Sequence, residues 1–189
     1  MQTLIYILIV AFIVLDLFLA LRVIEYIYCA FLHKQPPMVA SNNALRAIVA
    51  DQINKYYPNA KRICEIGSGF GGMARYVARH TNAKVVGVEN MPFSAFVSWV
   101  LGVFGKSSTV WGDAFEYLRN TREPFDIGIA YLGPKLTPML KDYGDKIRVL
   151  ISLDFKMPNM KPVRTIDLGY GNTVYHGKKY PHKVFIYEF

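Results

Sequence analysis

A mostly apolar stretch at residues 62–66 runs directly into a turn in which every second residue is glycine. The turn, residues 67–72, reads Gly-Ser-Gly-Phe-Gly-Gly, and a helix-like segment follows it. Glycine tolerates the positive φ angles of tight turns and lets the backbone approach another group closely. A strand, such a turn and a helix in this order predict the first half of a βαβ unit that binds a nucleotide.

The next apolar segment strengthens this prediction. Residues 84–88 are expected to form a strand that ends in Glu89, about twenty residues past the first glycine, where a βαβ nucleotide site places a carboxylate for the ribose hydroxyls. A third expected strand, 108–111, leads into Asp113 and brings a second carboxylate to the same sheet edge. Glycine clusters also occur in ordinary βα turns, so the acidic residue downstream makes the motif more specific.

An acidic residue inside the end of the first strand separates two cofactor classes. Glu65 gives the spacing Glu-x-Gly-x-Gly-x-Gly, whereas dinucleotide dehydrogenases use Gly-x-Gly-x-x-Gly and bind a pyrophosphate at the turn. A carboxylate repels a pyrophosphate and attracts a cofactor that carries an ammonium and a sulfonium. The motif therefore favours S-adenosylmethionine over NAD.

Strands and helices alternate along the rest of the chain. The expected elements are a helix after 41–43 that stops at Pro58, strand 62–66, helix 72–80, strand 84–88, helix 92–104, strand 108–111, short helix 115–119, strand 125–131, helix 136–143 and strand 147–155. Segments 164–168, 173–177 and 183–189 have no helical spacing and are expected to be antiparallel strands. We therefore predict an α/β fold, a Rossmann-like doubly wound sheet that is mostly parallel with an antiparallel C-terminal β ending.

The N-terminal segment has a different composition. Residues 3–21 contain fourteen Leu, Ile, Val or Phe and a single charge, Asp16. Membrane insertion of those apolar residues is favourable by about 4–8 kcal/mol, against a cost of about 2.5–3.5 kcal/mol for a central aspartate. We predict one transmembrane helix within residues 1–32, with its span at about 3–25, then a linker at 33–43 and a globular domain at 44–189.

Other interpretations of this segment fit less well. A signal peptide needs a basic start, a shorter apolar core and a small-x-small cleavage site, and a mitochondrial presequence is amphipathic and Arg-rich. Asp16 is either a partner for another helix within the membrane or a tolerated carboxylate, and both stay open. The positive-inside tendency predicts a single-pass protein whose domain faces the cytoplasm in a bacterial inner membrane, or the matrix in a mitochondrion.

The net charge of +8 lies entirely on residues 35–189. A basic domain beside a membrane anchor predicts contact with an anionic leaflet surface. Nucleic acid is disfavoured, because there is no Lys/Arg-rich run, zinc-type spacing or RNA-binding aromatic signature. The four histidines have no metal spacing, so no metal is expected, and a disulfide between Cys29 and Cys64 is not expected either.

The motif from Glu65, together with Glu89 and Asp113, resembles motif I, the acidic end of strand two and the adenine-contacting segment of class I methyltransferases. More narrowly, the chain resembles the membrane-anchored lysine methyltransferase family that includes the mitochondrial enzymes modifying ATP synthase subunit c and the adenine nucleotide translocase. The likeness includes the N-terminal hydrophobic segment, the Pro-containing stretch at 36–41 and the tail at 160–175. That family usually has Asp-x-Gly-Ser-Gly-Asp-Gly-Arg, and here Glu, Phe and Gly replace the two Asp residues and the Arg.

The resemblance implies a cofactor, S-adenosylmethionine, and a set of binding residues in a methyltransferase domain at 44–189. The glycine-rich backbone would pass under the cofactor, Glu65 would hold the methionyl ammonium, Glu89 would hold the ribose diol, Asp113 would accept the adenine amino group, and Ala114 or Phe115 would pack on the ring. The complete expected set is Glu65, Gly67, Ser68, Gly69, Gly71, Glu89, Asn90, Asp113 and Ala114. Asp113 equally suits a helix N-cap, and the two roles can coexist.

Methyl transfer mainly requires that a nucleophile be aligned with an already activated methyl group. A lysine nucleophile must also be neutral, which desolvation favours. Tyr131, at the end of strand 125–131, is the candidate catalytic residue, or else a packed aromatic at the sheet edge. We expect N-methylation of lysine on a membrane-associated protein. The alternatives are a lipid or lipophilic small-molecule substrate, and a non-catalytic module that binds S-adenosylmethionine or serves assembly.

The expected helix 92–104 is apolar on nearly all sides. One interpretation is a helix pressed between the sheet and its neighbours. The other is a helix whose outer face touches the bilayer or docks a membrane-embedded substrate.

Overall fold

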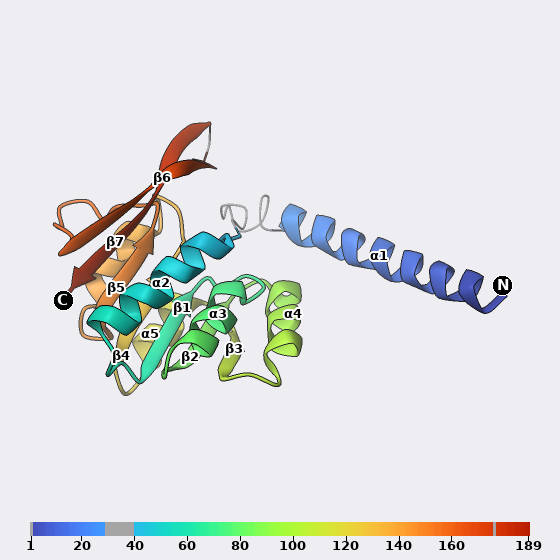
Figure 1. Cartoon of the computed structure of the whole chain (residues 1–189), viewed down its shortest axis with the longest axis horizontal. Coiled ribbons are helices and arrows are strands. Elements are labelled where there is room, and N and C mark those ends of the chain that lie inside the picture. Colours follow the sequence, from blue (N-terminus) through green and yellow to red (C-terminus); the bar gives the residue numbers. More distant parts are fainter. Residues whose placement is uncertain (1, 29–39, 176) are drawn as a thin grey trace. The chain divides into compact units, whose positions relative to one another are not determined.

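A computed structural model describes residues 2–28, 40–175 and 177–189 (Figure 1). The chain forms two compact units, Met1–Pro37 and Met38–Phe189. The first unit contains helix α1 (Gln2–Tyr28), whose residues Gln2–Glu25 are long and apolar enough to cross a membrane. The expected continuation of this helix to residue 32, and residues 33–39 of the expected linker, lie outside the described residues.

The second unit is built on a seven-stranded sheet with the order β3-β2-β1-β4-β5-β7-β6. Its strands are β1 (Arg62–Ile66), β2 (Lys84–Glu89), β3 (Ser107–Trp111), β4 (Phe125–Ala130), β5 (Ile147–Leu153), β6 (Arg164–Tyr175) and β7 (Lys178–Glu188). Its helices are α2 (Asn43–Tyr56), α3 (Gly72–His80), α4 (Pro92–Gly102), α5 (Ala114–Asn120) and the 3-10 helix η2 (Thr137–Tyr143). Strands β1 to β5 are parallel to one another, and β7 is antiparallel to β5 and β6. The predicted fold class is confirmed.

The strand order reverses beside β1. The chain moves outward from β1 through β2 to β3, and then returns to place β4 on the other side of β1. In doubly wound sheets of this kind, ligands bind outside the carboxyl ends of the strands at such a reversal. The glycine-rich turn directly follows β1 and therefore lies at this point.

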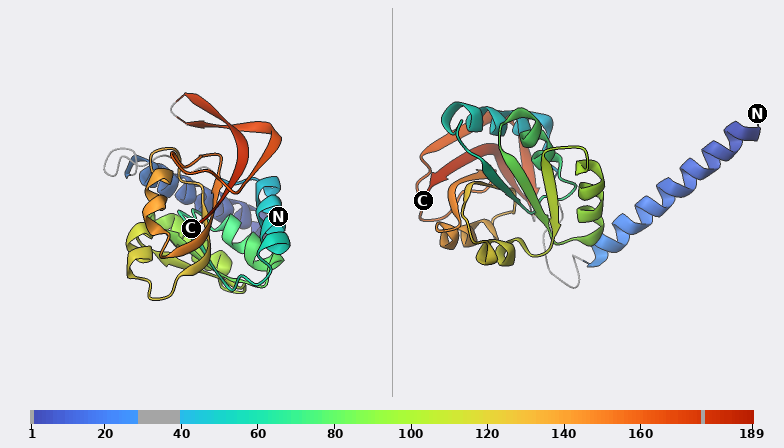
Figure 2. Two further views of the ribbon diagram at one scale, coloured as in Figure 1. Left: turned by 90° about the vertical axis from the view of Figure 1, so that its left-hand side faces the viewer. Right: turned by 90° about the horizontal axis from the view of Figure 1, so that it is seen from below.

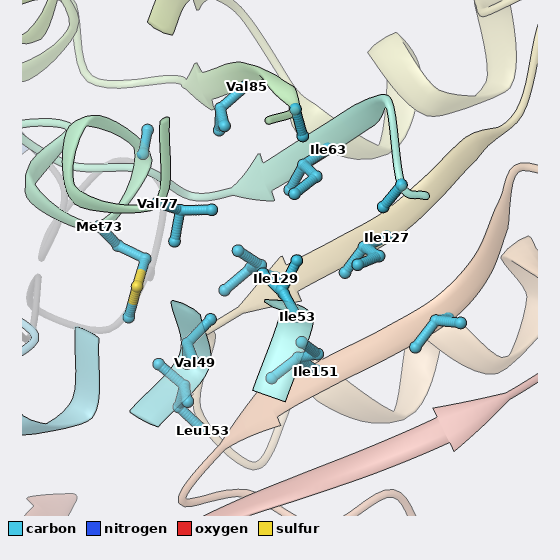
Figure 3. Packing of buried hydrophobic residues seen from close by; sticks show 14 of the residues in the cluster. Val49, Ile53, Ile63, Met73, Val77, Val85, Ile127, Ile129, Ile151 and Leu153 are labelled. Carbon is cyan, nitrogen blue, oxygen red and sulfur yellow. The ribbon is translucent and has the colours of Figure 1, made fainter. Parts of the chain in front are cut away.

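Helices cover both faces of the sheet (Figure 2). On one face, apolar residues of α2 and α3 pack against β1, β2, β4 and β5, as Figure 3 shows. On the other face, α5 and η2 cover a second core that includes Leu118, Phe125 and Leu140. Helix α4 lies beside β3 at the end of the sheet, where Ser98 Oγ is 2.8 Å from Thr109 Oγ1. Thr109 is in register with Gly87, which faces α3, so α4 covers the same face as α3.

The C-terminal strands differ from the expectation. Segments 164–168 and 173–177 are expected to be two strands, but residues 164–168 and 173–175 belong to the single long β6, which ends at Tyr175. Its pairing with β7 shifts register between Asp167 and Asn172. Gly169 and Gly171 both have positive φ there, so the glycines bend the strand instead of ending it. Strand β7 begins at residue 178 and not 183, and it contains Pro181, a residue that usually argues against a strand interior.

Helix α4 contradicts the interpretation of a helix pressed between the sheet and its neighbours. Its buried residues are the small ones, Ser94, Ala95, Ser98 and Gly102. Its large apolar side chains are exposed: Phe96, Trp99, Val100 and Leu101, followed by Val103 and Phe104. The surface of the sheet next to α4 accepts only small side chains, so the bulky ones point away from it.

Candidate active site

The glycine-rich turn closes tightly on the end of β2. The backbone nitrogens of Gly67 and Ser68 each donate a 3.0 Å hydrogen bond to the carbonyl of Val88. Gly67 has a φ of 73°, and a Cβ at this position would lie 2.7 Å from Leu132 Cδ2. Gly71, the N-cap of α3, has a φ of 68°, and a Cβ there would lie 2.2 Å from Ser98 Oγ. The turn therefore requires glycine for both its backbone angles and its space.

Glu65 extends from β1 to the start of α3. Its Oε2 accepts a 2.8 Å hydrogen bond from the backbone nitrogen of Ala74, in the first turn of the helix. Burial, opposed by this hydrogen bond, raises the pKa of the Glu65 carboxyl to about 8, and the nearby Glu89 adds to the rise. Arg46 and Arg75 act in the opposite direction. A cation that entered beside Glu65 would favour the ionised carboxylate.

Glu89 ends β2 and is also buried. Its Oε2 accepts a 2.6 Å hydrogen bond from the backbone nitrogen of Gly69, and its Oε1 accepts one of 2.9 Å from Met91. Glu89 thus holds the turn in place from the end of β2.

A cavity of about 150 Å³ opens at the turn. Five of the expected site residues line it, namely Glu65, Gly67, Ser68, Gly69 and Tyr131. Arg46 from α2 and Arg75 from α3 line it too, so acidic and basic side chains face the same space. The buried hydroxyl of Ser68 has no hydrogen-bond partner among the described residues, which leaves it available to a ligand.

The remaining expected residues lie further along the strand ends. Asp113 is exposed and caps α5, accepting a 2.8 Å hydrogen bond from the backbone nitrogen of Glu116. The backbone nitrogen of Gly112 donates a 2.9 Å hydrogen bond to the carbonyl of Glu89, which fixes Asp113 near the end of β2. Asn90 accepts a 3.1 Å hydrogen bond from the Trp111 indole through its carbonyl. Ala114 packs against the core beneath α5. In the described part of the chain, Gly71, Glu89, Asn90, Asp113 and Ala114 do not line the 150 Å³ cavity.

Tyr131, just past β4, belongs to a buried polar network. Its hydroxyl donates a 2.6 Å hydrogen bond to Asp154 Oδ2 and also contacts Thr173 Oγ1. The same Asp154 oxygen lies 2.7 Å from Thr173 Oγ1 and 2.8 Å from His182 Nδ1. The backbone nitrogen of Lys183 donates a 3.0 Å hydrogen bond to Asp154 Oδ1. The ends of β4 and β5 are thereby tied to β6 and β7 beside the cavity.

The environment of Tyr131 keeps its phenol protonated. Burial raises the pKa of Tyr131 most, and its hydrogen bond to Asp154 raises it further. The hydroxyl therefore serves as a hydrogen-bonding group and not as a phenolate base. Asp154 has a φ of 61°, a backbone region that aspartate tolerates better than most residues. The network thus combines an unusual backbone angle with a fully hydrogen-bonded carboxylate.

Sequence reasoning missed five residues of this site: Arg46, Arg75, Asp154, Thr173 and His182. Asp154 had a usable signal, because it directly follows an apolar strand, and Glu89 and Asp113 likewise lie at strand ends. The expected strand 147–155 hid it, whereas β5 ends at residue 153. Thr173 and His182 lie on β6 and β7, and no local pattern predicts that these strands return to the end of β4.

Solved structures similar to this fold include methyltransferases. An RNA methyltransferase from Salinibacter ruber, in complex with S-adenosyl-L-homocysteine, has a TM-score of 0.61 at 21% identity over 79% of this chain and 93% of that one. An O-methyltransferase from Bacillus cereus, also in complex with S-adenosyl-L-homocysteine, has a TM-score of 0.57 at 16% identity over 88% and 89%. The chain has the Rossmann-like methyltransferase fold. No protein-family model and no curated protein sequence matches it.

The methyltransferase fold accounts for where the site lies. It places the glycine-rich turn, Glu89 and Asp113 along the carboxyl edge of β1, β2 and β3, and it places Tyr131 across the strand-order reversal on β4. Within residues 2–28, 40–175 and 177–189, no group of three His, Cys, Asp or Glu side chains could hold a metal ion.

Proposed function

We propose that this chain is an S-adenosylmethionine-dependent methyltransferase. The observation that carries the proposal is the cavity at the strand-order reversal. It is lined by Glu65 from β1, Arg46 from α2 and Arg75 from α3. The methionyl end of the cofactor is a zwitterion, so Glu65 would bind its ammonium and the two arginines its carboxylate. Ser68 would donate its unpartnered hydroxyl to the same group. When bound, S-adenosylmethionine supplies a methyl group on a sulfonium sulfur.

The strand ends beyond the cavity suit the nucleoside half of the cofactor. Glu89, at the end of β2, would accept hydrogen bonds from the ribose diol. Asp113 would accept from the adenine amino group, because its cap to Glu116 uses Oδ1 and leaves Oδ2. Asn90 and Ala114 would flank the ring. The cofactor would thus extend along the sheet edge from β1 toward β3, with its methionyl end in the cavity and its adenine near Asp113.

Tyr131 is our candidate for the substrate side. It lines the cavity from the end of β4, and Asp154 holds its hydroxyl in one orientation. A lysine amine must be neutral to attack a methyl group, and a buried wall that offers hydrogen bonds favours that form. We infer that Tyr131 positions the acceptor nitrogen through its hydroxyl.

We further propose that α1 anchors the protein in a membrane as a single span, with the domain on the cytoplasmic or matrix side. Tyr28 and Ala40 are twelve residues apart, so an extended chain separates them by at most about 40 Å. The domain, which carries the positive charge, would then remain beside an anionic leaflet. The expected substrate is therefore a lysine on a membrane-associated protein.

A lipid or lipophilic small-molecule substrate is the second candidate, and the exposed apolar side chains of α4 favour it. A non-catalytic module that binds the cofactor or serves assembly is the third. The detergent-solubilised chain, incubated with methyl-labelled S-adenosylmethionine and host membranes, separates them. Label in protein supports the first candidate, and acid hydrolysis should then release methylated lysine. Label in the lipid extract supports the second, and label in neither, despite cofactor binding, supports the third.

The label-transfer experiment needs a matched control. A Tyr131→Phe variant should bind the demethylated cofactor but transfer less label. RNA is a further fraction to count, because the Salinibacter ruber enzyme is named as an RNA methyltransferase. Label confined to RNA would overturn the lysine proposal and the lipid alternative together.

A further inference from the structure

The outer side of α4 is an apolar surface built from seven large side chains, which we call the α4 face. It consists of Phe96, Trp99, Val100, Leu101, Val103, Phe104 and, from the neighbouring β3, Trp111. Phe104 is fully exposed and Trp111 is 69% exposed. A groove of about 260 Å³ between Phe96, Trp99 and Trp111 runs along this surface. Soluble proteins seldom leave so many large apolar side chains together in water.

Packing inside the domain does not explain the α4 face. The inner side of α4 already fits the sheet through small residues, with Ser98 against Thr109 and Gly102 against Ser107. Strand β3 is an edge strand, so no further strand lies beyond it within the described residues. A partner must therefore cover the α4 face from outside the domain.

The chemistry of the α4 face fits the interface of a lipid bilayer. Residues 90–105 carry no charged side chain, and Lys106 follows them immediately. Tryptophan prefers the boundary between acyl chains and headgroups, and a lysine at that depth meets anionic headgroups. Amphipathic helices that lie in the membrane plane combine these features, with an apolar side buried about 5–10 Å below the headgroups.

We propose that the α4 face inserts into the interfacial layer of the membrane that α1 spans. The inference rests on the proposed anchoring, because the chain between Tyr28 and Ala40 is too short to let the domain diffuse away. Anchoring keeps the α4 face within reach of the bilayer, so that even a modest insertion energy suffices for stable contact. The domain then has two membrane attachments, one spanning and one lying in the interface.

This contact would set the distance from the bilayer to the cofactor site. The inner side of α4 touches the glycine-rich turn, where Ser98 blocks any Cβ on Gly71 and the ring of Phe93 lies edge-on to Phe70 at 6.5 Å. An α-helix with its side chains is about 10–12 Å across. The turn would therefore lie within one helix diameter of the headgroups, so that an acceptor nitrogen at the membrane surface could reach the cavity.

Intrinsic fluorescence tests this proposal directly, because the chain has only two tryptophans and both lie on the α4 face. The full chain is reconstituted into vesicles of phosphatidylcholine and phosphatidylglycerol, some with lipids brominated near the headgroup end of the acyl chain and others with lipids brominated near its middle. We expect a shift of the emission to shorter wavelength, strong quenching by the shallow bromines, weaker quenching by the deep ones and little by aqueous iodide. Iodide quenching of both tryptophans without bromine quenching would overturn the proposal.

Single-tryptophan and charge variants localise the contact. Trp99→Phe and Trp111→Phe each leave one reporter, and both reporters should be quenched by the shallow bromines. Val103→Asp should remove most of that quenching. Val163→Asp is its matched control, because Val163 is 54% exposed against 53% for Val103 and lies off the α4 face. Equal quenching in the two aspartate variants would overturn the proposal.

Other occupants of the α4 face give different results. If a second copy covers it, iodide protection grows with the protein-to-lipid ratio and bromine quenching is absent. If α1 covers it, protection is independent of that ratio and bromine quenching is again absent. Both results overturn the proposal. Carbonate extraction separates this failure from that of the anchor: a chain that stays in the membrane without bromine quenching refutes only the α4 contact, whereas an extracted chain refutes the proposed anchoring.

Discussion

The carboxylate of Glu89 accepts a 2.6 Å hydrogen bond from the backbone nitrogen of Gly69, twenty residues earlier in the chain. This bond crosses from the end of β2 to the middle of the glycine-rich turn. It makes the residue proposed to bind the ribose also the residue that holds the turn. Substitutions at Glu89 are therefore expected to affect both ligand affinity and the local order of the turn.

For Glu89→Ala we expect weaker binding of S-adenosylhomocysteine, by about 1.5–3 kcal/mol, since a hydrogen bond to a charged acceptor is worth that much. Titration calorimetry on the detergent-solubilised chain measures it. The cofactor should raise the melting temperature of the wild-type protein, whereas NAD should not. An unchanged affinity in the variant would place the ribose elsewhere, and equal stabilisation by NAD would refute the choice of cofactor.

Glu65 should make the stability of the domain depend on pH. Its pKa rises from an ordinary 4.5 to about 8 in the folded protein, mainly through burial, so folding favours its protonated form. This contribution is complete below pH 4.5 and is lost as the pH rises through 8, with a slope of at most about 1.4 kcal/mol per pH unit. Denaturant unfolding at several pH values should show the decline in the wild type. The Glu65→Gln variant should lack the part of this decline that Glu65 causes. Parallel curves of unfolding free energy against pH for the two proteins would contradict the prediction.

Gly71→Ala should destabilise the domain through backbone strain and a clash with Ser98. A non-glycine residue at positive φ costs about 1–2 kcal/mol, and the 2.2 Å approach to Ser98 Oγ adds to that cost. Gly169→Ala is the matched control, because Gly169 has a φ of 70° and open space around a Cβ. We expect the Gly71 variant to lose more unfolding free energy than the control, and Ser98→Ala to restore part of the difference. Equal losses would show that the turn relaxes without cost.

Tyr131→Phe separates a positioning role from a purely structural one. Removing the hydroxyl takes one of four hydrogen bonds from Asp154, which should cost about 0.5–1.5 kcal/mol of stability. If Tyr131 also orients the acceptor nitrogen, the transfer rate should fall while the affinity for S-adenosylhomocysteine stays unchanged. Thr173→Val removes another donor to Asp154 without touching the cavity. A rate loss no greater in Tyr131→Phe than in Thr173→Val would leave Tyr131 with only a structural role.

Much of the fold could be predicted because its signals are local. The bounds of β1 and α3 agree with the expected 62–66 and 72–80, and the glycine-rich turn marks the end of β1 and the start of α3. The Tyr131–Asp154 network could not be predicted, because it joins the ends of β4 and β5 to residues within β6 and β7, which meet only in the folded sheet. The orientation of α4 lies between these cases. Its small residues recur at 94, 98 and 102, a helical stripe that indicates a close approach to the sheet.

The last prediction concerns topology, which decides which substrates the domain can reach. We expect a single span at about residues 3–25 with the N-terminus outside, and residues 35–189 entirely on the cytoplasmic or matrix side. Lys34 and Arg46 follow the span closely, and the whole net charge of +8 lies on residues 35–189, which the positive-inside tendency keeps on that side. Protease added to sealed vesicles with the outer face exposed should leave the domain intact, and the same protease should digest it once detergent opens them. Digestion of the domain in sealed vesicles would refute the topology, and a substrate lysine on the cytoplasmic or matrix surface would then be excluded.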